Sequence, residues 1–145
     1  MALFSPYIIA AGLGWIIAQL SKYVVASIKR GKVASVRQLY LSGNMPSAHS
    51  ATVVALLTVI AYHDGVGSGL FALALVFTSI VVYDAMMVRR SSGEQGVALR
   101  QLLKETKSRV AQPRVAMGHT PLEVAVGALI GLLVGLVVVM TVVNS

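Results

Sequence analysis

The segment PLEVAVGALIGLLVGLVVVMTVV, residues Pro121–Val143, decides the fold, because Glu123 is its only charged side chain. About 20 apolar residues in a helix cross the hydrocarbon core of a bilayer, so this segment predicts a membrane span. Three more apolar stretches predict further spans: Pro6–Ile28, Ser47–Tyr62 and Leu70–Val88. The second of these is short. We expect an all-α integral membrane helical bundle of about four transmembrane helices, with residues 1–145 forming a single membrane domain.

The overall composition is also typical of a membrane protein. Of 145 residues, 57% are hydrophobic and 12% are charged, which leaves too little polar surface for a soluble globule. The first apolar stretch is too long and starts too early for a cleaved signal peptide, and no small-residue cleavage site follows it. The absence of cysteine excludes disulfides and thiolate chemistry. The net charge of +7 is expected to reflect cytoplasmic loops and anionic lipid, and we expect no nucleic-acid partner.

Basic residues are concentrated in two of the three connections between the predicted spans. The first connection contains Lys29, Arg30, Lys32 and Arg37, and the third contains Arg89, Arg90, Arg100, Lys104, Lys107, Arg109 and Arg114. The positive-inside rule places both connections in the cytoplasm and both termini outside. Apolar residues also recur at helical spacing in the third connection, from Ala98 to Val110. They predict an amphipathic interfacial helix on the inner leaflet that ends at Pro113, with a solvated, partly helical loop as the alternative.

The last predicted span carries two local signals. Thr120, Pro121 and Glu123 have the spacing of a capping box with proline at the first helical position. Glycine recurs at every fourth position from Gly127 to Gly135, which creates a flat stripe that another helix can approach closely. Because that helix can belong to this chain or to a second copy, a homodimer is one expected assembly.

Two histidines occupy matching positions at predicted helix starts. His49 opens the second span and His119 precedes the fourth, each after a polar, basic stretch. A helix N-terminus favours anions, because its first N–H groups are unpaired and lie at the positive end of the dipole. In the predicted topology Lys22, Asp84 and Arg89 end other spans at the same membrane level. We therefore expect these side chains to converge on one anion site.

Such a set of side chains suits phosphoryl transfer. Positive groups stabilise the phosphate oxygens, while one imidazole attacks phosphorus and a second protonates the leaving oxygen. A zinc site built from His49, His119, Asp84 and Glu123 is the alternative use of the same residues. Their spacing matches no zinc motif, so the sequence predicts neither a metal nor another cofactor.

The residues around both histidines resemble a known family. Met45-Pro46-Ser47-Ala48-His49 resembles the Pro-Ser-Gly-His motif of type 2 phosphatidic acid phosphatases and vanadium haloperoxidases, and His119–Val124 resembles their last motif. The chain as a whole is similar to the small divergent PAP2 group over nearly its full length. The segments that carry this similarity are Ala18-Gln19 with Lys22, Met45–Ala51, Tyr83-Asp84-Ala85 with Val88-Arg89-Arg90, and Gly118–Val124.

The resemblance implies a role for each matching residue. His119 corresponds to the nucleophile that forms a phosphohistidine, and Glu123 stands where an aspartate orients that nucleophile. His49 corresponds to the histidine that protonates the leaving group. Ser47 and the backbone around Ala48 correspond to groups that hold phosphate oxygens.

The chain also departs from the family pattern around its cations. Lys22 matches the first motif, but Lys29 and Arg30 follow it in place of an Arg-Pro pair, and Pro113 stands where the last motif has arginine. We infer that Arg89 or Arg90 supplies the missing guanidinium. Lys22, Arg89, Arg90 and Asp84, together with Ser47, are therefore the expected substrate-binding residues.

The sequence predicts a phosphatase of the cell membrane. It would hydrolyse a phosphate monoester or diphosphate of a lipid or isoprenoid at the cytoplasmic face, so its partners are that anionic substrate and the membrane. One alternative is a non-catalytic membrane protein that binds anionic lipid or phosphate with a degenerate site. Another is a small transporter or channel in which Asp84 and Lys22 line a path. Each of these two residues, considered alone, also has a structural interpretation. Lys22 is typical of a lysine whose ammonium extends to the lipid headgroups, and Asp84 is typical of an acidic residue at the membrane interface.

Overall fold

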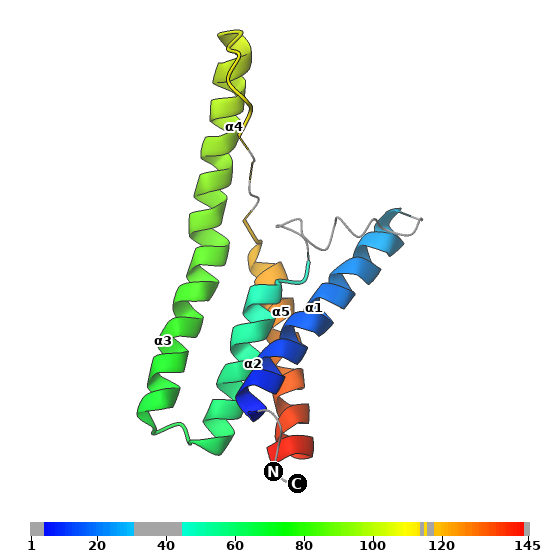
Figure 1. Cartoon of the computed structure of the whole chain (residues 1–145), viewed down its shortest axis with the longest axis vertical. Coiled ribbons are helices and arrows are strands. Elements are labelled where there is room, and N and C mark those ends of the chain that lie inside the picture. Colours follow the sequence, from blue (N-terminus) through cyan, green and yellow to red (C-terminus); the bar gives the residue numbers. More distant parts are fainter. Residues whose placement is uncertain (1–4, 31–44, 114, 116–117, 144–145) are drawn as a thin grey trace.

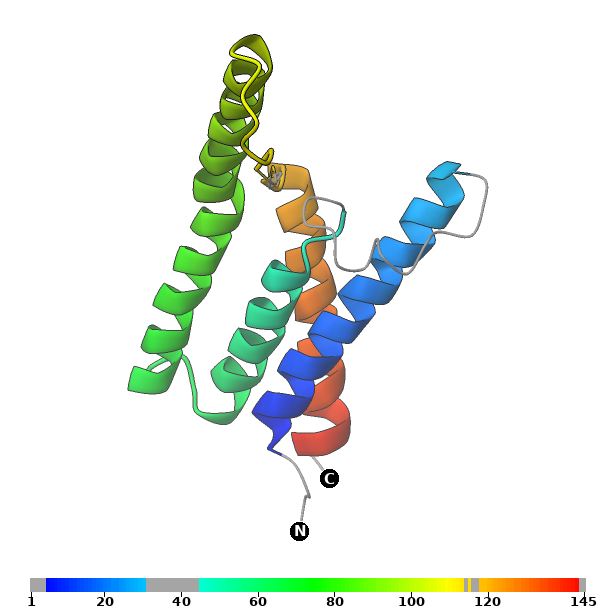
Figure 2. The same cartoon turned by 45° about the horizontal axis from the view of Figure 1, so that its top comes forward.

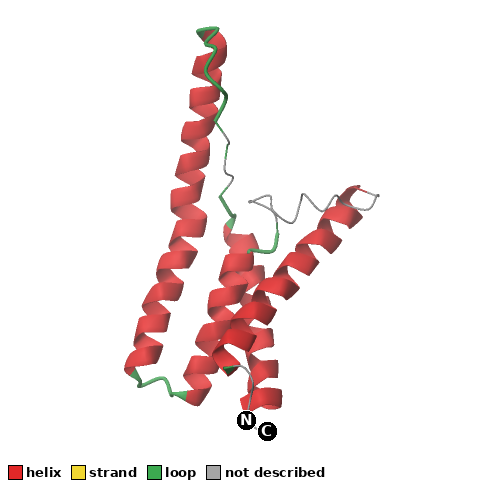
Figure 3. Cartoon of the chain, viewed as in Figure 1, coloured by secondary structure: helices red, strands yellow, loops and turns green. Residues whose placement is uncertain are grey.

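The described part of the chain is built from helices. The computed structural model describes residues 5–113, apart from 31–44, together with 115 and 118–143. The elements in chain order are α1 (Pro6–Arg30), α2 (Ala48–His63), α3 (Gly69–Tyr83), η2 (Asp84–Val88), α4 (Arg89–Glu105), α5 (Pro121–Val138) and η3 (Val139–Val143). Segments η2 and η3 are π-helical. Figure 3 shows no strand within the described ranges.

The helices have the lengths that a membrane protein needs. Three of them are long and apolar enough to cross a membrane: Pro6–Ile28, Gly69–Glu105 and Pro121–Val142. The apolar helix Ala48–His63 is shorter, about 24 Å long at a rise of 1.5 Å per residue. The ends of the four predicted apolar stretches agree with these helices to within two residues, apart from the extension of α3 into α4. The fold is therefore the predicted membrane helical bundle.

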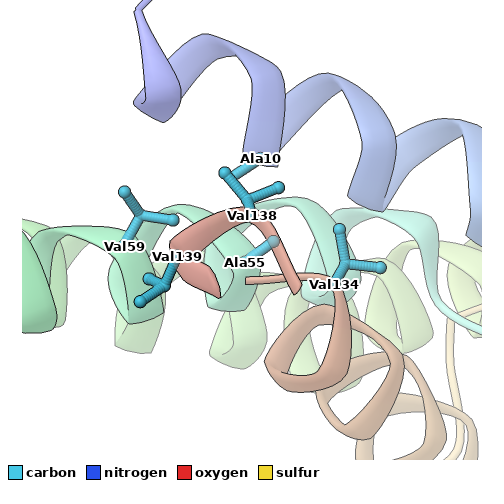
Figure 4. Close-up of a cluster of buried hydrophobic side chains, with 6 residues drawn as sticks. All are labelled: Ala10, Ala55, Val59, Val134, Val138 and Val139. Atoms are coloured by element: carbon cyan, nitrogen blue, oxygen red, sulfur yellow. The ribbon is translucent and has the colours of Figure 1, made fainter. Parts of the chain in front are cut away.

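Helix α2 lies at the centre of the bundle and packs against α1, α3 and α5, as Figures 1 and 2 show. One buried cluster joins α1, α2, the end of α5 and the start of η3 (Figure 4); its members are Ala10, Ala55, Val59, Val134, Val138 and Val139. A second cluster near the start of α2 contains Ala18, Ala48 and Ala51. The first cluster consists of valine and alanine and the second of alanine alone. Alanine lets helix backbones approach closely, which suits helices in lipid because they associate through close packing and not through hydrophobic burial.

The glycine stripe of α5 packs against α2 of the same chain. A methyl group added at Gly127 would meet the carbonyl oxygen of Ser47, and one added at Gly131 would meet that of Ala51. The same crowding recurs one turn further along, at Gly135. The stripe is thus filled within the chain and supplies no argument for a homodimer, which stays a prediction.

We expect Gly131→Ala to destabilise the protein and Gly12→Ala to be tolerated. The new methyl at Gly131 would overlap the backbone of Ala51, whereas nothing lies within 4 Å of the corresponding position at Gly12. Overpacking of this kind destabilises by about 1–3 kcal/mol, and alanine is otherwise the better helix former by about 1 kcal/mol. Thermal unfolding of both variants in detergent measures the difference. Equal midpoints would contradict the close approach of α2 and α5.

Helices α3 and α4 form one continuous rod with η2 between them. Figure 1 shows that this rod extends far beyond the start of α5. The third connection does contain an amphipathic helix, but it begins at Arg89 instead of near Ala98 and continues along the direction of α3 instead of lying on the membrane surface as predicted. No proline lies between Tyr83 and Glu105 to break the helix. Its apolar side chains, such as Val97 and Leu102, are about half exposed.

The end of α4 differs from the prediction, which placed it at Pro113. The helix ends at Glu105, and Lys107 then has a positive φ of 49°. The N–H groups of Lys107 and Ser108 donate to carbonyl oxygens of the last turn at 3.2 and 3.0 Å, which is the hydrogen bonding of a Schellman motif. The chain then returns along α4, where Arg100 Nε donates to the carbonyl oxygen of Pro113 at 2.8 Å. The prediction for Pro113 was wrong because a left-handed residue satisfies the last carbonyls before the proline is reached.

The predicted site residues lie at one end of the bundle. At the opposite end, the start of α1 meets the end of α2, where the Tyr7 hydroxyl donates to Asp64 Oδ2 at 2.6 Å and lies 2.9 Å from His63 Nδ1. The end of α1 and the starts of α2 and α5 therefore share the other end with η2. The assignment of this end to the cytoplasm stays a prediction, because helix length and composition do not distinguish the two sides of a membrane. Lys32, Arg37 and Arg114, which contribute to that assignment, lie outside the described residues.

Candidate functional site

His119 and Glu123 form a hydrogen-bonded pair at the start of α5. His119 Nδ1 lies 3.1 Å from Glu123 Oε2, and His119 is only 6% exposed. An ionised carboxylate can only accept, so Nδ1 is the donor in this pair, and in the neutral ring Nε2 then keeps its lone pair. The pairing therefore prepares Nε2 of His119 to act as a nucleophile or a base.

The carboxylate of Glu123 also caps the helix. Its Oε2 accepts the backbone N–H of Thr120 at 3.0 Å, and Thr120 Oγ1 accepts the backbone N–H of Glu123 at 3.3 Å. These two bonds are the predicted capping box, with Pro121 at the first helical position. One carboxylate oxygen thus starts the helix and orients the His119 ring, so the ring is fixed by the local fold.

Two backbone hydrogen bonds attach the histidine motifs to the rest of the bundle. The N–H of His119 donates to the carbonyl oxygen of Ala85 at 2.9 Å, which joins the motif to η2. The N–H of Ser47 donates to the carbonyl oxygen of Glu123 at 3.1 Å, which joins the start of α2 to the first turn of α5. The two motifs are therefore neighbours in space although they are far apart in sequence.

His49 is surrounded by charged groups from several helices. It is the second residue of α2, and its side chain is exposed. Arg89, Lys22, Asp84 and the imidazole of His119 are all near enough to act on the His49 ring electrostatically. The structure therefore brings these predicted site residues together, and their roles in binding and catalysis stay predictions.

Lys22 is a buried cation on α1. It is 5% exposed and forms no hydrogen bond or ion pair with another described residue. The Glu123 carboxylate acts on it electrostatically without direct contact. A buried ammonium is costly unless an anion pairs with it. Lys22 is thus placed to receive a negatively charged group.

Gln19 lies one turn before Lys22 and is absent from the predicted site. Its Oε1 is the one completely enclosed side-chain oxygen or nitrogen that lacks a hydrogen-bond partner in the described ranges, since the Lys22 ammonium, which is also unpaired there, is not completely enclosed. Buried polar atoms are normally paired, so an unpaired one indicates a position that a ligand or a water molecule fills. The sequence signal that could have identified Gln19 was a polar residue one helical turn from an intramembrane lysine.

The two candidate arginines have different surroundings. Arg89 Nε donates to Asp84 Oδ2 at 2.9 Å, close to His49. Arg90 Nε donates to Glu94 Oε1 at 3.1 Å, and both of those side chains are largely exposed. Of the two, Arg89 therefore lies with the cations around His49.

A cavity of about 650 Å³ lies between α4 and the start of α5. Its lining residues are Arg90, Gly93, Glu94, Val97, Val115, Gly118, His119, Thr120, Pro121 and Glu123. His49 and Lys22 are not among them. His119 therefore belongs both to the wall of this cavity and to the charged cluster around His49, whereas Glu123 belongs to the wall and pairs with His119.

Ser47 serves as the N-cap of α2. Its Oγ accepts the backbone N–H of Ser50 at 3.3 Å and the Ser50 hydroxyl at 2.9 Å, and Ser47 has no exposed surface. The hydroxyl therefore already has a structural function in starting the helix. A contact between Ser47 and phosphate stays a prediction.

The alternative zinc site is not assembled in the described ranges. No three histidine, aspartate or glutamate side chains group closely enough there to hold a metal ion. Asp84 is paired with Arg89, and Glu123 with His119. Each carboxylate of the alternative thus has a partner that is not a metal.

Comparisons with known proteins identify relatives of this chain. The chain is 38% identical over 103 residues to the uncharacterized membrane protein YuiD of Bacillus subtilis (strain 168). That match covers 61% of this chain and 65% of the relative, so the chain spans less than two thirds of the relative's length. No solved structure matches the chain significantly. The sequence pattern of the Divergent PAP2 family matches residues 4–134, and the chain therefore belongs to that family.

Proposed function

We propose that this protein is a membrane phosphatase that hydrolyses a phosphate monoester or diphosphate of a lipid or isoprenoid. The observation that carries the proposal is the buried His119 ring, whose Nδ1 is held by Glu123 so that Nε2 is free to attack. Family membership supports a phosphatase-related role. A nucleophile with a carboxylate orienter is the arrangement that covalent catalysis requires.

The position of the site favours a substrate in the membrane. Lys22 belongs to the candidate span Pro6–Ile28, and His119 directly precedes the span Pro121–Val142. Groups at the ends of spanning helices lie at the level of the lipid headgroups. A lipid phosphate or isoprenoid phosphate carries its phosphorus at this level. The positive-inside rule places this end at the cytoplasmic face.

In the first proposed step, Nε2 of His119 attacks phosphorus as the bond to the ester oxygen breaks. His49 in its protonated form gives its proton to the departing alkoxide, so the alcohol leaves neutral. The phosphoryl group is then bound covalently to His119. Lys22 and Arg89 balance the negative charge on the phosphoryl oxygens throughout.

In the second step, water hydrolyses the phosphohistidine. The neutral His49 left by the first step takes a proton from water, and the water oxygen attacks phosphorus as the bond to Nε2 breaks. Inorganic phosphate leaves, and both histidines return to their initial states. The cycle transfers one phosphoryl group to water and uses no redox partner.

We expect the purified protein to release inorganic phosphate from vesicles that contain a lipid phosphate, with a chelator present and with inhibition by vanadate. Phosphatidic acid and an isoprenoid diphosphate are suitable test substrates. Lys22→Met retains the length and the apolar stem of the lysine side chain but removes the ammonium charge. This variant should therefore raise KM about tenfold with a smaller effect on kcat. Phosphate release is measured as a function of substrate concentration for both proteins.

The outcome also separates the phosphatase from the non-catalytic alternative. Turnover that vanadate inhibits supports the proposal. Retained binding of lipid-phosphate vesicles without phosphate release from either substrate class would overturn it and favour a lipid-binding protein. Unchanged KM in Lys22→Met would remove Lys22 from the substrate site.

A further inference from the structure

A π-helical turn interrupts the long rod at the level of the candidate site. The turn η2 comprises Asp84–Val88, and the backbone N–H of Arg89 donates to the carbonyl oxygen of Asp84. This five-residue spacing is the hydrogen bonding of a π-helix, a rare feature that is frequent at functional sites. The location of η2 beside both histidine motifs therefore calls for a specific explanation.

The turn brings Asp84 and Arg89 onto the same side of the rod. In an α-helix, residues five apart point about 140° away from each other, since each turn takes 3.6 residues. In η2 the side chains meet instead, with Arg89 Nε 2.9 Å from Asp84 Oδ2. Both the backbone and the side chain of Arg89 are therefore bonded to Asp84, and the π-helical geometry makes the second bond possible.

The ion pair leaves the end of the guanidinium available. It uses Nε of Arg89, so the terminal nitrogens can still donate to two oxygens of a phosphate. Arg89 is about one third exposed and Asp84 about two fifths, so a ligand can reach the pair. Arg89 is also near enough to the His49 ring to act on it electrostatically.

The same turn also holds the His119 motif. The carbonyl oxygen of Ala85, within η2, accepts the backbone N–H of His119 at 2.9 Å, and Ala85 is buried. Directly after η2, the backbone of Arg90 is in close contact with Gly118, where an added methyl would lie 2.6 Å from the Arg90 nitrogen. The single turn η2 is therefore bonded both to Arg89, through Asp84, and to His119, through Ala85.

We propose that η2 assembles the anion site and that Asp84 is a positioning residue, which holds the guanidinium of Arg89 in that site. The inference rests on the proposed function and goes beyond it, because it assigns Asp84 to Arg89 and not to the substrate. The predicted set of substrate-binding residues then contains Arg89 as the phosphate ligand and Asp84 as its support.

A double-mutant cycle tests this assignment. Asp84→Ala and Arg89→Ala should each weaken vanadate binding about tenfold, as expected for the loss of one charge-assisted contact. The double variant should bind as weakly as Arg89→Ala alone, because Asp84 acts only through Arg89. Asp84→Asn retains an oxygen that accepts from Nε and should recover most of the affinity. Vanadate affinity is measured in detergent by titration, and KM and kcat for lipid phosphate are measured beside it.

Glu105→Ala provides the control on the same rod. Glu105 accepts from Gln101 at 3.0 Å near the far end of α4, so its loss should leave vanadate affinity unchanged. Additive losses in the double variant of an active protein would overturn the positioning role and leave the phosphatase standing. A non-additive cycle in a protein that binds vanadate but releases no phosphate would overturn the phosphatase and retain the positioning role.

Discussion

His119→Ala is expected to abolish phosphate release from lipid phosphates. The variant lacks the nitrogen that attacks phosphorus, so the covalent route is closed and the rate should fall at least about a thousandfold. The capping box needs only Thr120 and Glu123, so the start of α5 should persist in the variant. Phosphate release from vesicles gives the rate, and thermal unfolding in detergent verifies the fold.

His63→Ala is the matched control for this loss. His63 is a histidine at the end of α2, exposed and paired with Tyr7 and Asp64, far from the candidate site. Its replacement should leave phosphate release within about twofold of the parent, as is usual for a surface position. If His119→Ala turned over at the parent rate, the assignment of the nucleophile would be wrong.

His49→Gln is expected to slow the hydrolysis of alkyl phosphates much more than that of aryl phosphates. Loss of a general acid lowers the rate by about 10²–10⁴-fold when the leaving oxygen needs a proton. A nitrophenolate leaves without protonation, so p-nitrophenyl phosphate should lose far less. Because His49 is exposed at the start of α2, glutamine can replace it without disturbing the core.

The ratio of the two losses identifies the role of His49. A large loss on a lipid phosphate with a small loss on p-nitrophenyl phosphate assigns proton transfer to this residue. Equal losses on both substrates would contradict that role and would make His49 a binding group. Initial rates at low substrate, measured on the same preparation, give kcat/KM for the comparison, because this quantity reports the transfer to His119 and not the later water step, which also uses His49 and is common to both substrates.

Hydropathy alone predicted where the helices run. The ends of the apolar stretches agree closely with α1, α2, η2 and α5–η3. This succeeds because a span in lipid must satisfy its own backbone hydrogen bonds, so length and apolarity leave helix as the available structure. The end of α4 was predicted less well. A left-handed residue, Lys107, ends it, and lysine gives no sequence signal for that conformation.

The candidate site likewise has one feature that the sequence predicts and one that it does not. The pairing of His119 with Glu123 is local, since residues four apart and a capping box position each other within one turn. The pairing of Asp84 with Arg89 was not foreseeable, because residues five apart diverge in an ordinary α-helix. Sequence placed both residues at the site without showing that they bond to each other.

By itself, the sequence determined the membrane helices, the capping box of α5 and its glycine stripe, because each depends on neighbours within a few residues. Only the tertiary structure decided that the stripe packs on α2, that Ala85 holds His119, and that Lys22 is buried without an ion pair to another described residue. Those features depend on how helices approach one another. The approach of two helices is set by the shape of their whole packed faces and by the π-helical turn η2. A few neighbouring residues do not reveal the shape of a whole face.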